Sequence, residues 1–503
     1  MFITIIDEKN GFVKYSFVNL FIFLMLETFF LKIVFLFLNF VLQCEPNKQK
    51  RGVRMKKFDR YFYSTFASLA GVIALQNVIV FSVNLMDNIM LGRFSEVAMS
   101  GVSLANQIQF LLQMAVNGCA NGVAVISSQY WGKRQTDPIR KVFASGFMIA
   151  GLLSLLLGII VIAFPQQVLL LLSDETAIVQ AGAQYLRIMG FSYIIFAATN
   201  LLIALMRSVE SVKIGFAVSL VALVVNIFLN YCLIFGNFGF PQLGVRGAAY
   251  ATVTARVAEL LTALVYVLFV DKKLKLRLKD FFRIEKTYLR DYIKTGVPLI
   301  LSGSSWGIAM TVQTAIIGRL GEAAIGANAI AAPIYQVVSV LYASTSNAAG
   351  VIIGKTVGEG DIDRVKKYSK KLQWLFLAVG AFSCAALLVS KGAILSLYEV
   401  SEQTRALANT FLIILSVTVI GSSYEAPCLC GIVSGGGDTK FVLKNDIIFM
   451  WGIVLPLSFL SAFVFNWPIP VTFFLLKSDQ ITKCAVAVVK VNRFKWIRQL
   501  THE

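Results

Sequence analysis

The sequence predicts an all-α, polytopic membrane protein with twelve transmembrane helices. Three observations support this fold class: 57% of the 503 residues are hydrophobic, only 15% are charged, and the mean hydropathy is +0.74. An average soluble domain carries roughly 25% charged residues. Because a spanning helix needs about 20 mostly apolar residues, this apolar content suffices for a dozen of them. The composition excludes a disordered chain and an ordinary soluble enzyme.

Twelve long apolar runs follow one another along the chain and divide into two sets of six. Each run is long enough to cross a membrane as a helix. The first set occupies roughly 64–90, 98–128, 142–163, 180–206, 214–236 and 245–270. The second set occupies roughly 295–318, 327–354, 372–390, 405–433, 445–466 and 468–489. The twelfth run has the weakest support because Lys477, Asp479 and Lys483 interrupt it.

Lys and Arg are distributed unevenly between the two sides of this helix array. Segments 44–64 and 490–503 and the even-numbered loops hold 34 of them, whereas the odd-numbered loops hold five. Cytoplasmic loops collect Lys and Arg, so we expect both ends of the twelve-helix core in the cytoplasm. This topology accounts for most of the net charge of +19 without nucleic-acid binding. The predicted location is a bacterial-type cytoplasmic (plasma) membrane.

An internal repeat relates the two sets of helices. A shift of 226 residues aligns 87–141 with 313–367 without a gap, and 12 of the 55 pairs are identical. The identical pairs include Gly92/Gly318, Arg93/Arg319, Asn121/Asn347 and Gly132/Gly358. A shift by six helices makes the halves parallel copies, an arrangement found in secondary transporters whose substrate path lies between the halves. We therefore expect two pseudo-symmetric six-helix bundles.

The division of the chain follows from these runs. The predicted parts are an N-terminal extension 1–54, an N-terminal lobe 55–270, a basic cytoplasmic connector 271–294, a C-terminal lobe 295–489 and a cytoplasmic tail 490–503. The extension does not fit the symmetry, and our hypothesis is a misassigned start. Codons for Lys50-Arg51-Gly52 can spell a purine-rich ribosome-binding stretch before Met55. Mass spectrometry that finds the mature N-terminus upstream of Met55 would reject this hypothesis.

No catalytic set can be assembled from this sequence. The single histidine, His502, lies next to the C-terminus, so no imidazole can act as a base, a metal ligand or an intramembrane proton carrier. The seven cysteines show neither zinc nor disulfide spacing. We therefore expect no enzymatic activity and no cofactor.

A polar stripe runs along the second apolar helix. At 100° per residue its amide and hydroxyl side chains fall within an arc of about 80°. Amides that face lipid would lack partners, so we expect the stripe to line a cavity through Asn106, Gln113, Asn117 and Asn121. The alternative is close helix packing, which we favour for the smaller stripe on the eighth helix.

Two carboxylates within apolar runs are candidates for ion or substrate binding. An intramembrane carboxylate is costly unless it is solvated, paired or protonated, so it usually has a function. Asp87 ends the first helix, and its repeat partner is the neutral Gln313, which assigns any charge chemistry here to the N-terminal lobe. The alternative for Asp87 is a helix-end carboxylate near the outer interface. Glu425, in the tenth helix, could attract a cationic substrate or a coupling ion.

Five short segments between about residues 60 and 490 carry a family resemblance. They are Gln76-Asn77, Met86-Asp87-Asn88-Ile89-Met90-Leu91-Gly92-Arg93, Asn226-Ile227-Phe228-Leu229-Asn230, Gly247-Ala248-Ala249 and Gly296-Val297-Pro298. In combination they resemble the multidrug and toxic compound extrusion (MATE) family of transporters. The resemblance implies two six-helix bundles around a central cleft, and export of organic cations by alternating access, driven by inward H⁺ or Na⁺ flow.

The resemblance also implies roles for individual residues. Asp87 is similar to the family's coupling carboxylate in the first helix, and Asn226 to the first member of a cation-site pair in the fifth. Asn230 stands where some members have aspartate, and Trp306 where some have a glutamate. These departures leave H⁺ and Na⁺ both open, with Asp87 and Asn226 as the candidate Na⁺ site, and Asn200 is a further candidate. The expected cavity lining is completed by Gln76, Trp306 and Gln313.

The leading functional hypothesis is a secondary active antiporter that exports organic cations or drugs in exchange for inward H⁺ or Na⁺. Its partners would be small organic cations and membrane lipids, and we expect a monomer that binds no nucleic acid. The alternative is a lipid-linked oligosaccharide flippase of the same wider superfamily. Such a carrier would be expected to place several cationic residues in the cleft to bind a diphosphate.

Overall fold

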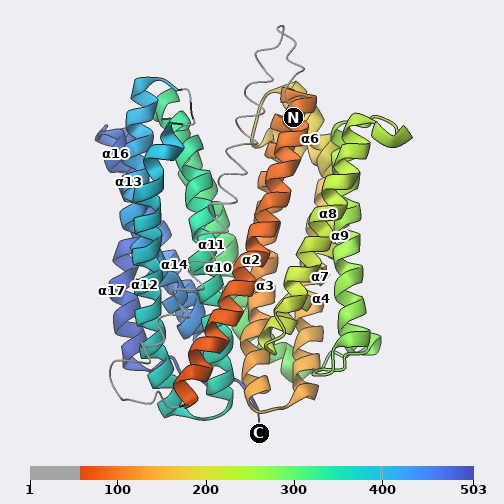
Figure 1. The fold of residues 1–503 in the computed structure, drawn as a ribbon, viewed down its shortest axis with the longest axis vertical. Helices are drawn as coiled ribbons and strands as arrows, with labels where there is room; N and C mark the ends of the chain where they lie inside the picture. Colours follow the sequence, from red (N-terminus) through yellow and green to blue (C-terminus); the bar gives the residue numbers. More distant parts are fainter. Residues whose placement is uncertain (1–56, 397, 399, 503) are drawn as a thin grey trace, which may run out of the picture.

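The protein is helical throughout the part of the chain that the structure describes. This computed structural model describes residues 57–396, 398 and 400–502, and no strand occurs among them (Figure 1). The predicted extension 1–54 lies outside the described residues. Eleven helices in the described part are long and apolar enough to cross a membrane. The predicted all-α, polytopic membrane fold is confirmed.

The first six predicted helices are all present. They are α2 (Lys57–Phe94), α3 (Glu96–Gly132), α4 (Thr136–Ala163), α6 with η1 and α7 (Thr176–Met189, Gly190–Ser192, Tyr193–Ser208), α8 (Lys213–Phe235), and α9 with η3 (Val245–Val265, Tyr266–Val270). The short α5 (Pro165–Leu170) and η2 (Asn237–Gly239) lie between them. Ser95 Oγ caps α3 by accepting the N–H of Ala98. Gly236 ends α8 in the left-handed conformation that glycine adopts without strain.

The second half of the chain repeats this order. It contains α10 (Lys286–Gly318), α11 (Glu322–Gly358), α12 (Ile362–Leu395), α13 with η5 (Glu402–Ala426, Pro427–Val433), and the continuous run of α14, η6, α15 and η7 (Thr439–Asp446, Ile447–Val454, Leu455–Phe459, Leu460–Val464). The connector holds one short helix, η4 (Leu278–Phe282). Helix α10 begins at Lys286, inside the predicted connector 271–294. Hydropathy did not reveal these first turns because they are charged.

The twelfth predicted helix, 468–489, is broken into two. Helices α16 (Ile469–Leu476) and α17 (Asp479–Arg493) are joined at Lys477 and Ser478, and neither is among the eleven candidate spans. The break coincides with the charged residues that interrupt the apolar run. Broken helices of this kind form substrate and ion sites in transporters, because their inner ends lie next to the transport path.

Three hydrophobic clusters hold the helices together. One is built from α2 to α10, one from α10 to α16, and the third joins α2 to α11, α12, η5 and α17. In the third cluster Phe62 of α2 stacks on Tyr368 of α12, with ring centroids 4.3 Å apart. Met90 and Leu91, at the other end of α2, belong to the first cluster. Helix α2 therefore begins against the second half of the chain and ends within the first.

The two halves are joined mainly at the end of the bundle that carries the C-terminus. There Lys355 of α11 forms an ion pair with Glu210, which follows α7, at 2.9 Å. The amide of Gln129 on α3 donates to the Gly435 backbone oxygen at 3.3 Å and accepts the N–H of Leu500 at 2.8 Å. In Figure 1 the helices α2–α9 and α10–α17 are closest at this end and spread apart toward the other.

Candidate transport sites

A buried polar site lies inside the first half, between α2, α8 and α9. The carboxylate of Asp87 on α2, which is only 6% exposed, accepts a hydrogen bond from the Asn230 amide on α8. The same amide donates to Asn226 Oδ1 at 3.0 Å, and Asn226 Nδ2 donates to Thr252 Oγ1 of α9 at 3.4 Å. Because Asn226 and Asn230 are one helical turn apart, both amides lie on one face of α8. The structure thus brings together the three residues that the resemblance grouped.

The oxygen atoms of this site suit a proton or a small hard cation. Asn230 Oδ1 is buried and has no hydrogen-bond partner among the described residues, although it belongs to the amide that contacts Asp87. A protonated Asp87 could donate to such an acceptor. Carboxylate, amide and hydroxyl oxygens are also the ligands that hard cations prefer. Either ion would therefore satisfy a buried acceptor whose desolvation otherwise costs free energy.

Two residues of α9, Thr252 and Arg256, lie next to this site, and the sequence analysis did not single out Thr252. Thr252 donates to the Ala248 backbone oxygen at 2.9 Å and accepts from Asn226. Arg256, only 7% exposed, donates to Ser192 Oγ at 3.0 Å and lies 4.7 Å from the centre of the Phe196 ring. The signal in the sequence was their spacing, since residues four apart share a helix face.

A cavity of about 370 Å³ lies between the two halves. Its size falls within the range of small-molecule sites. From the first half it is lined by α3 and by Arg207 of α7, and from the second by α10, α11, α13, η5, α14 and the α16–α17 junction. The predicted residues that line it are Asn117, Asn121, Trp306, Gln313 and Glu425.

Other predicted residues lie outside this lining. Asp87, Asn226 and Asn230 form the separate buried site described above. Gln76 packs against α8 so closely that a Cβ atom on Gly215 would lie 2.4 Å from its Oε1, and Asn200 donates to the Phe196 backbone oxygen of its own helix at 3.0 Å. Asn106 and Gln113 are half-buried on α3 and are not among the lining residues.

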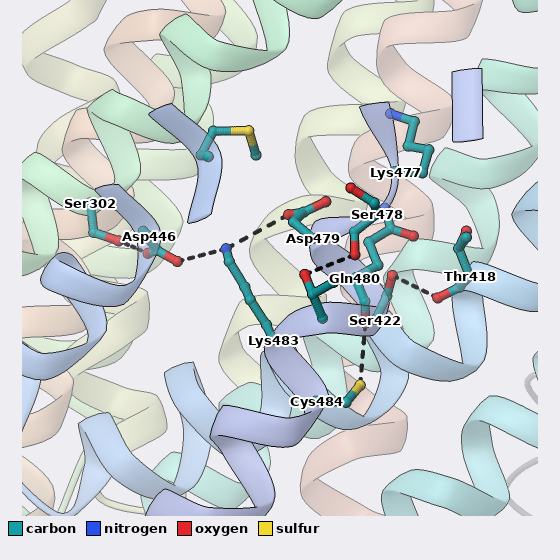
Figure 2. A network of polar contacts seen from close by, with 12 residues as sticks. Ser302, Thr418, Ser422, Asp446, Lys477, Ser478, Asp479, Gln480, Lys483 and Cys484 are labelled. Carbon is teal, nitrogen blue, oxygen red and sulfur yellow. Dashed lines mark hydrogen bonds and ion pairs between the residues drawn. The ribbon is translucent and has the colours of Figure 1, made fainter. Parts of the chain in front are cut away.

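The second half contributes a charged network to the cavity wall. Lys483 of α17, only 4% exposed, lies 3.0 Å from Asp446 Oδ1 and 3.7 Å from Asp479 Oδ2. Ser302 of α10 donates a hydrogen bond to the other oxygen of Asp446. Figure 2 shows the chain of contacts from Ser302 through Asp446 and Lys483 to Asp479. In the sequence Asp479 and Lys483 only marked interruptions of the twelfth run, and their i, i+4 spacing was the available signal.

Both halves of the chain match one family model. The MatE model matches residues 73–232 and 298–460, which together span more than half of the chain and contain Asp87, Asn226, Asn230 and Glu425. The chain belongs to the MATE family of transporters. It is therefore a multi-pass membrane transporter and not an enzyme.

Individual relatives agree with this membership. The uncharacterized transporter YisQ of Bacillus subtilis is 28% identical over 377 residues, which cover 74% of this chain and 82% of that protein. The probable multidrug resistance protein YoeA of the same organism is 26% identical over 427 residues, which cover 82% and 90%. A crystal structure of a MATE transporter in complex with MaL6 has a TM-score of 0.76 at 17% identity and covers 86% of this chain and 96% of its own. That likeness shows a shared fold.

Proposed function

We propose that this MATE transporter is a secondary antiporter that exports small organic cations in exchange for inward H⁺ or Na⁺. The observation that carries the proposal is the buried Asp87 carboxylate, which accepts a hydrogen bond from Asn230, whose amide also contacts Asn226. An intramembrane carboxylate of this kind typically marks an ion or proton pathway, which supports a role in ion exchange. The probable multidrug resistance proteins among the relatives support a drug-like cargo.

Coupling requires that the ion and the cargo bias the same equilibrium between two lobe arrangements. Asp87 lies on α2, whose first turns pack on the second half while its last turns belong to the first. Binding of H⁺ or Na⁺ at Asp87 would neutralise its charge and change how α2 packs against α8. We propose that this change alters the angle between the halves and releases the cargo.

The arrangement of the contacts between halves supports an outward-facing state. The end that carries the C-terminus is the expected cytoplasmic end, because it gathers the Lys and Arg of the connector and tail. It is also the end closed by the Lys355–Glu210 ion pair and the Gln129 contacts. The cavity would then exchange cargo with the outside.

Ethidium uptake into everted membrane vesicles, which corresponds to efflux from the cell, tests this function. We expect D87N to abolish efflux while the protein remains in the membrane, because an amide cannot exchange a proton or bind Na⁺ as a carboxylate does. The matched control is E96Q, which changes an exposed acid in the first turn of α3 and should leave efflux intact. Imposing pH and Na⁺ gradients separately identifies the coupling ion. Efflux by D87N at the unaltered rate would contradict the proposal.

A further inference from the structure

The cavity between the halves carries balanced charge. Six charged side chains line it, three acidic and three basic. They are Arg207, Glu425, Asp446, Lys477, Asp479 and Lys483. A site built only for cations would be expected to carry a surplus of carboxylates, since complementary charge selects the partner. Groups of both signs at one cavity wall suit a cargo that carries charges of both signs.

Three of these six charged side chains pair with one another. Lys483 lies between Asp446 and Asp479, at 3.0 and 3.7 Å, and Ser302 donates to Asp446. Removing one partner of a buried ion pair is strongly destabilising, because it leaves the other charge uncompensated. This network forms a fixed part of the wall, so the charged groups left for a ligand are Arg207, Lys477 and Glu425. Of these, Arg207 donates to Asn121 Oδ1 at 3.4 Å.

Lys477 is a buried ammonium group outside this network. It stands at the junction of α16 and α17 and is 9% exposed. Its Nζ donates to Gln313 Oε1 at 3.1 Å and lies 6.0 Å from the centre of the Tyr335 ring. No carboxylate in the described part of the chain lies within ion-pair distance of it. Figure 2 shows Lys477 apart from the Asp446–Lys483–Asp479 network. An ammonium left in this way at a cavity wall is suited to bind an anionic group.

The repeat places an acid in one half opposite a neutral amide in the other. The 226-residue shift places Gln313 on Asp87. In the first half, the carboxylate at this position accepts an amide hydrogen bond from Asn230. In the second half, the amide accepts a hydrogen bond from the ammonium of Lys477. The first half thus presents an acid for a small cation, and the second presents a cation for an anionic ligand.

Glu425 supplies the complementary charge on the same wall. It lies at the end of α13, is half-buried and lines the cavity. Among the described residues, its carboxylate has no hydrogen-bond or ion-pair partner. It can therefore bind a protonated amine without first giving up a contact within the protein.

We propose that the cavity binds a zwitterionic cargo, with its carboxylate on Lys477 and its protonated amine on Glu425. This inference rests on the proposed export of organic cations and adds a preference for those that also carry a carboxylate. The flanking Trp306, Tyr335 and Tyr342 give the cavity aromatic surface for the apolar body of such a molecule.

A pair of dyes that differ in one group tests the proposal. Rhodamine 6G is an ester with a single positive charge, and its de-esterified free acid is a zwitterion at neutral pH. We would measure the binding of both to the purified full-length protein by fluorescence polarisation. The free acid should bind about tenfold more tightly, because a hydrogen-bonded charge pair is worth about this factor.

Variants assign the preference to individual residues. K477Q should bring the two affinities to within about twofold of each other, whereas K477R should keep the preference for the acid. E425Q should weaken the binding of both dyes, because both carry the cationic group. The matched control is K391Q: Lys391 also donates to an amide oxygen, Asn409 Oδ1 at 3.2 Å, but does not line the cavity.

The outcomes separate this proposal from the proposed function. If the unaltered protein binds the ester as tightly as the acid, or if K477Q keeps the preference, the zwitterion proposal is overturned while cation export stands. If K477Q fails to fold, the preference of the unaltered protein decides the question. If neither dye binds and ethidium is not exported, both proposals are overturned.

Discussion

Gly132 and Gly358 are partners in the internal repeat, and each packs against the helix that carries the other. A Cβ atom on Gly132 would lie 2.1 Å from the Lys355 backbone oxygen, and one on Gly358 would lie 1.9 Å from that of Gln129. Helices α3 and α11 therefore cross at backbone contact, and only glycine permits this. The internal repeat thus places a glycine on each of the two helices at this crossing.

We predict that G358V separates the halves at this crossing. A side chain there meets backbone, which cannot move aside, so overpacking should cost about 1–3 kcal/mol. Thermal unfolding in detergent should show a lower Tm, and ethidium efflux should fall. The matched control is G151V, because a Cβ atom on Gly151 of α4 would meet nothing within 4 Å. An unchanged Tm for G358V would contradict the close crossing.

The Lys355–Glu210 ion pair should favour the arrangement of the two halves in which the end that carries the C-terminus is closed. Its side chains are about one-fifth exposed, so the pair should be worth about 0.2–1 kcal/mol, or up to about a fivefold change in the equilibrium between lobe arrangements. E210K should reduce ethidium efflux within this range, and the exchange variant E210K/K355E should restore part of it. A double variant that is no better than E210K would show that the pair does not act in transport.

The amide cage should determine how well Asp87 holds its ion. N230A removes the group that donates to Asp87. If Na⁺ is the coupling ion, the Na⁺ concentration needed for half-maximal efflux should rise about tenfold, because an amide oxygen that can bind the ion is lost. If H⁺ is the coupling ion, the H⁺ concentration needed should fall instead, because the donated hydrogen bond stabilises the ionised carboxylate. The control is N237A, which changes a half-buried amide in η2 outside the site. Equal ion dependence in N230A and the unaltered protein would show that the amide does not tune the coupling site.

The order of the helices could be predicted from sequence because each apolar run needs only its own composition to be recognised. Asp87, Asn226 and Asn230 could be grouped through the family resemblance, although 139 residues separate Asp87 from Asn226. Asp446 could not be found in this way. It ends α14 at the start of an apolar run, where a charge is ordinary, and only the packing of α17 beside it supplies Lys483. Pairing between distant helices has no signature in a single sequence.

The charged network in the cavity wall gives the sharpest stability prediction. K483M would leave Asp446 and Asp479 without their cation in a buried site. Removing one member of a buried ion pair typically costs about 3–5 kcal/mol, so the Tm in detergent should fall clearly.

The double variant K483M/D446N separates charge from packing, because it removes one of the two orphaned carboxylates and should recover part of the lost stability. The control is K366M, since the Lys366–Asp363 pair is exposed, with side chains 45% and 95% accessible, and such pairs contribute little. If K483M/D446N were no more stable than K483M, the loss would come from the missing lysine stem, and the carboxylates would have to be solvated from the cavity.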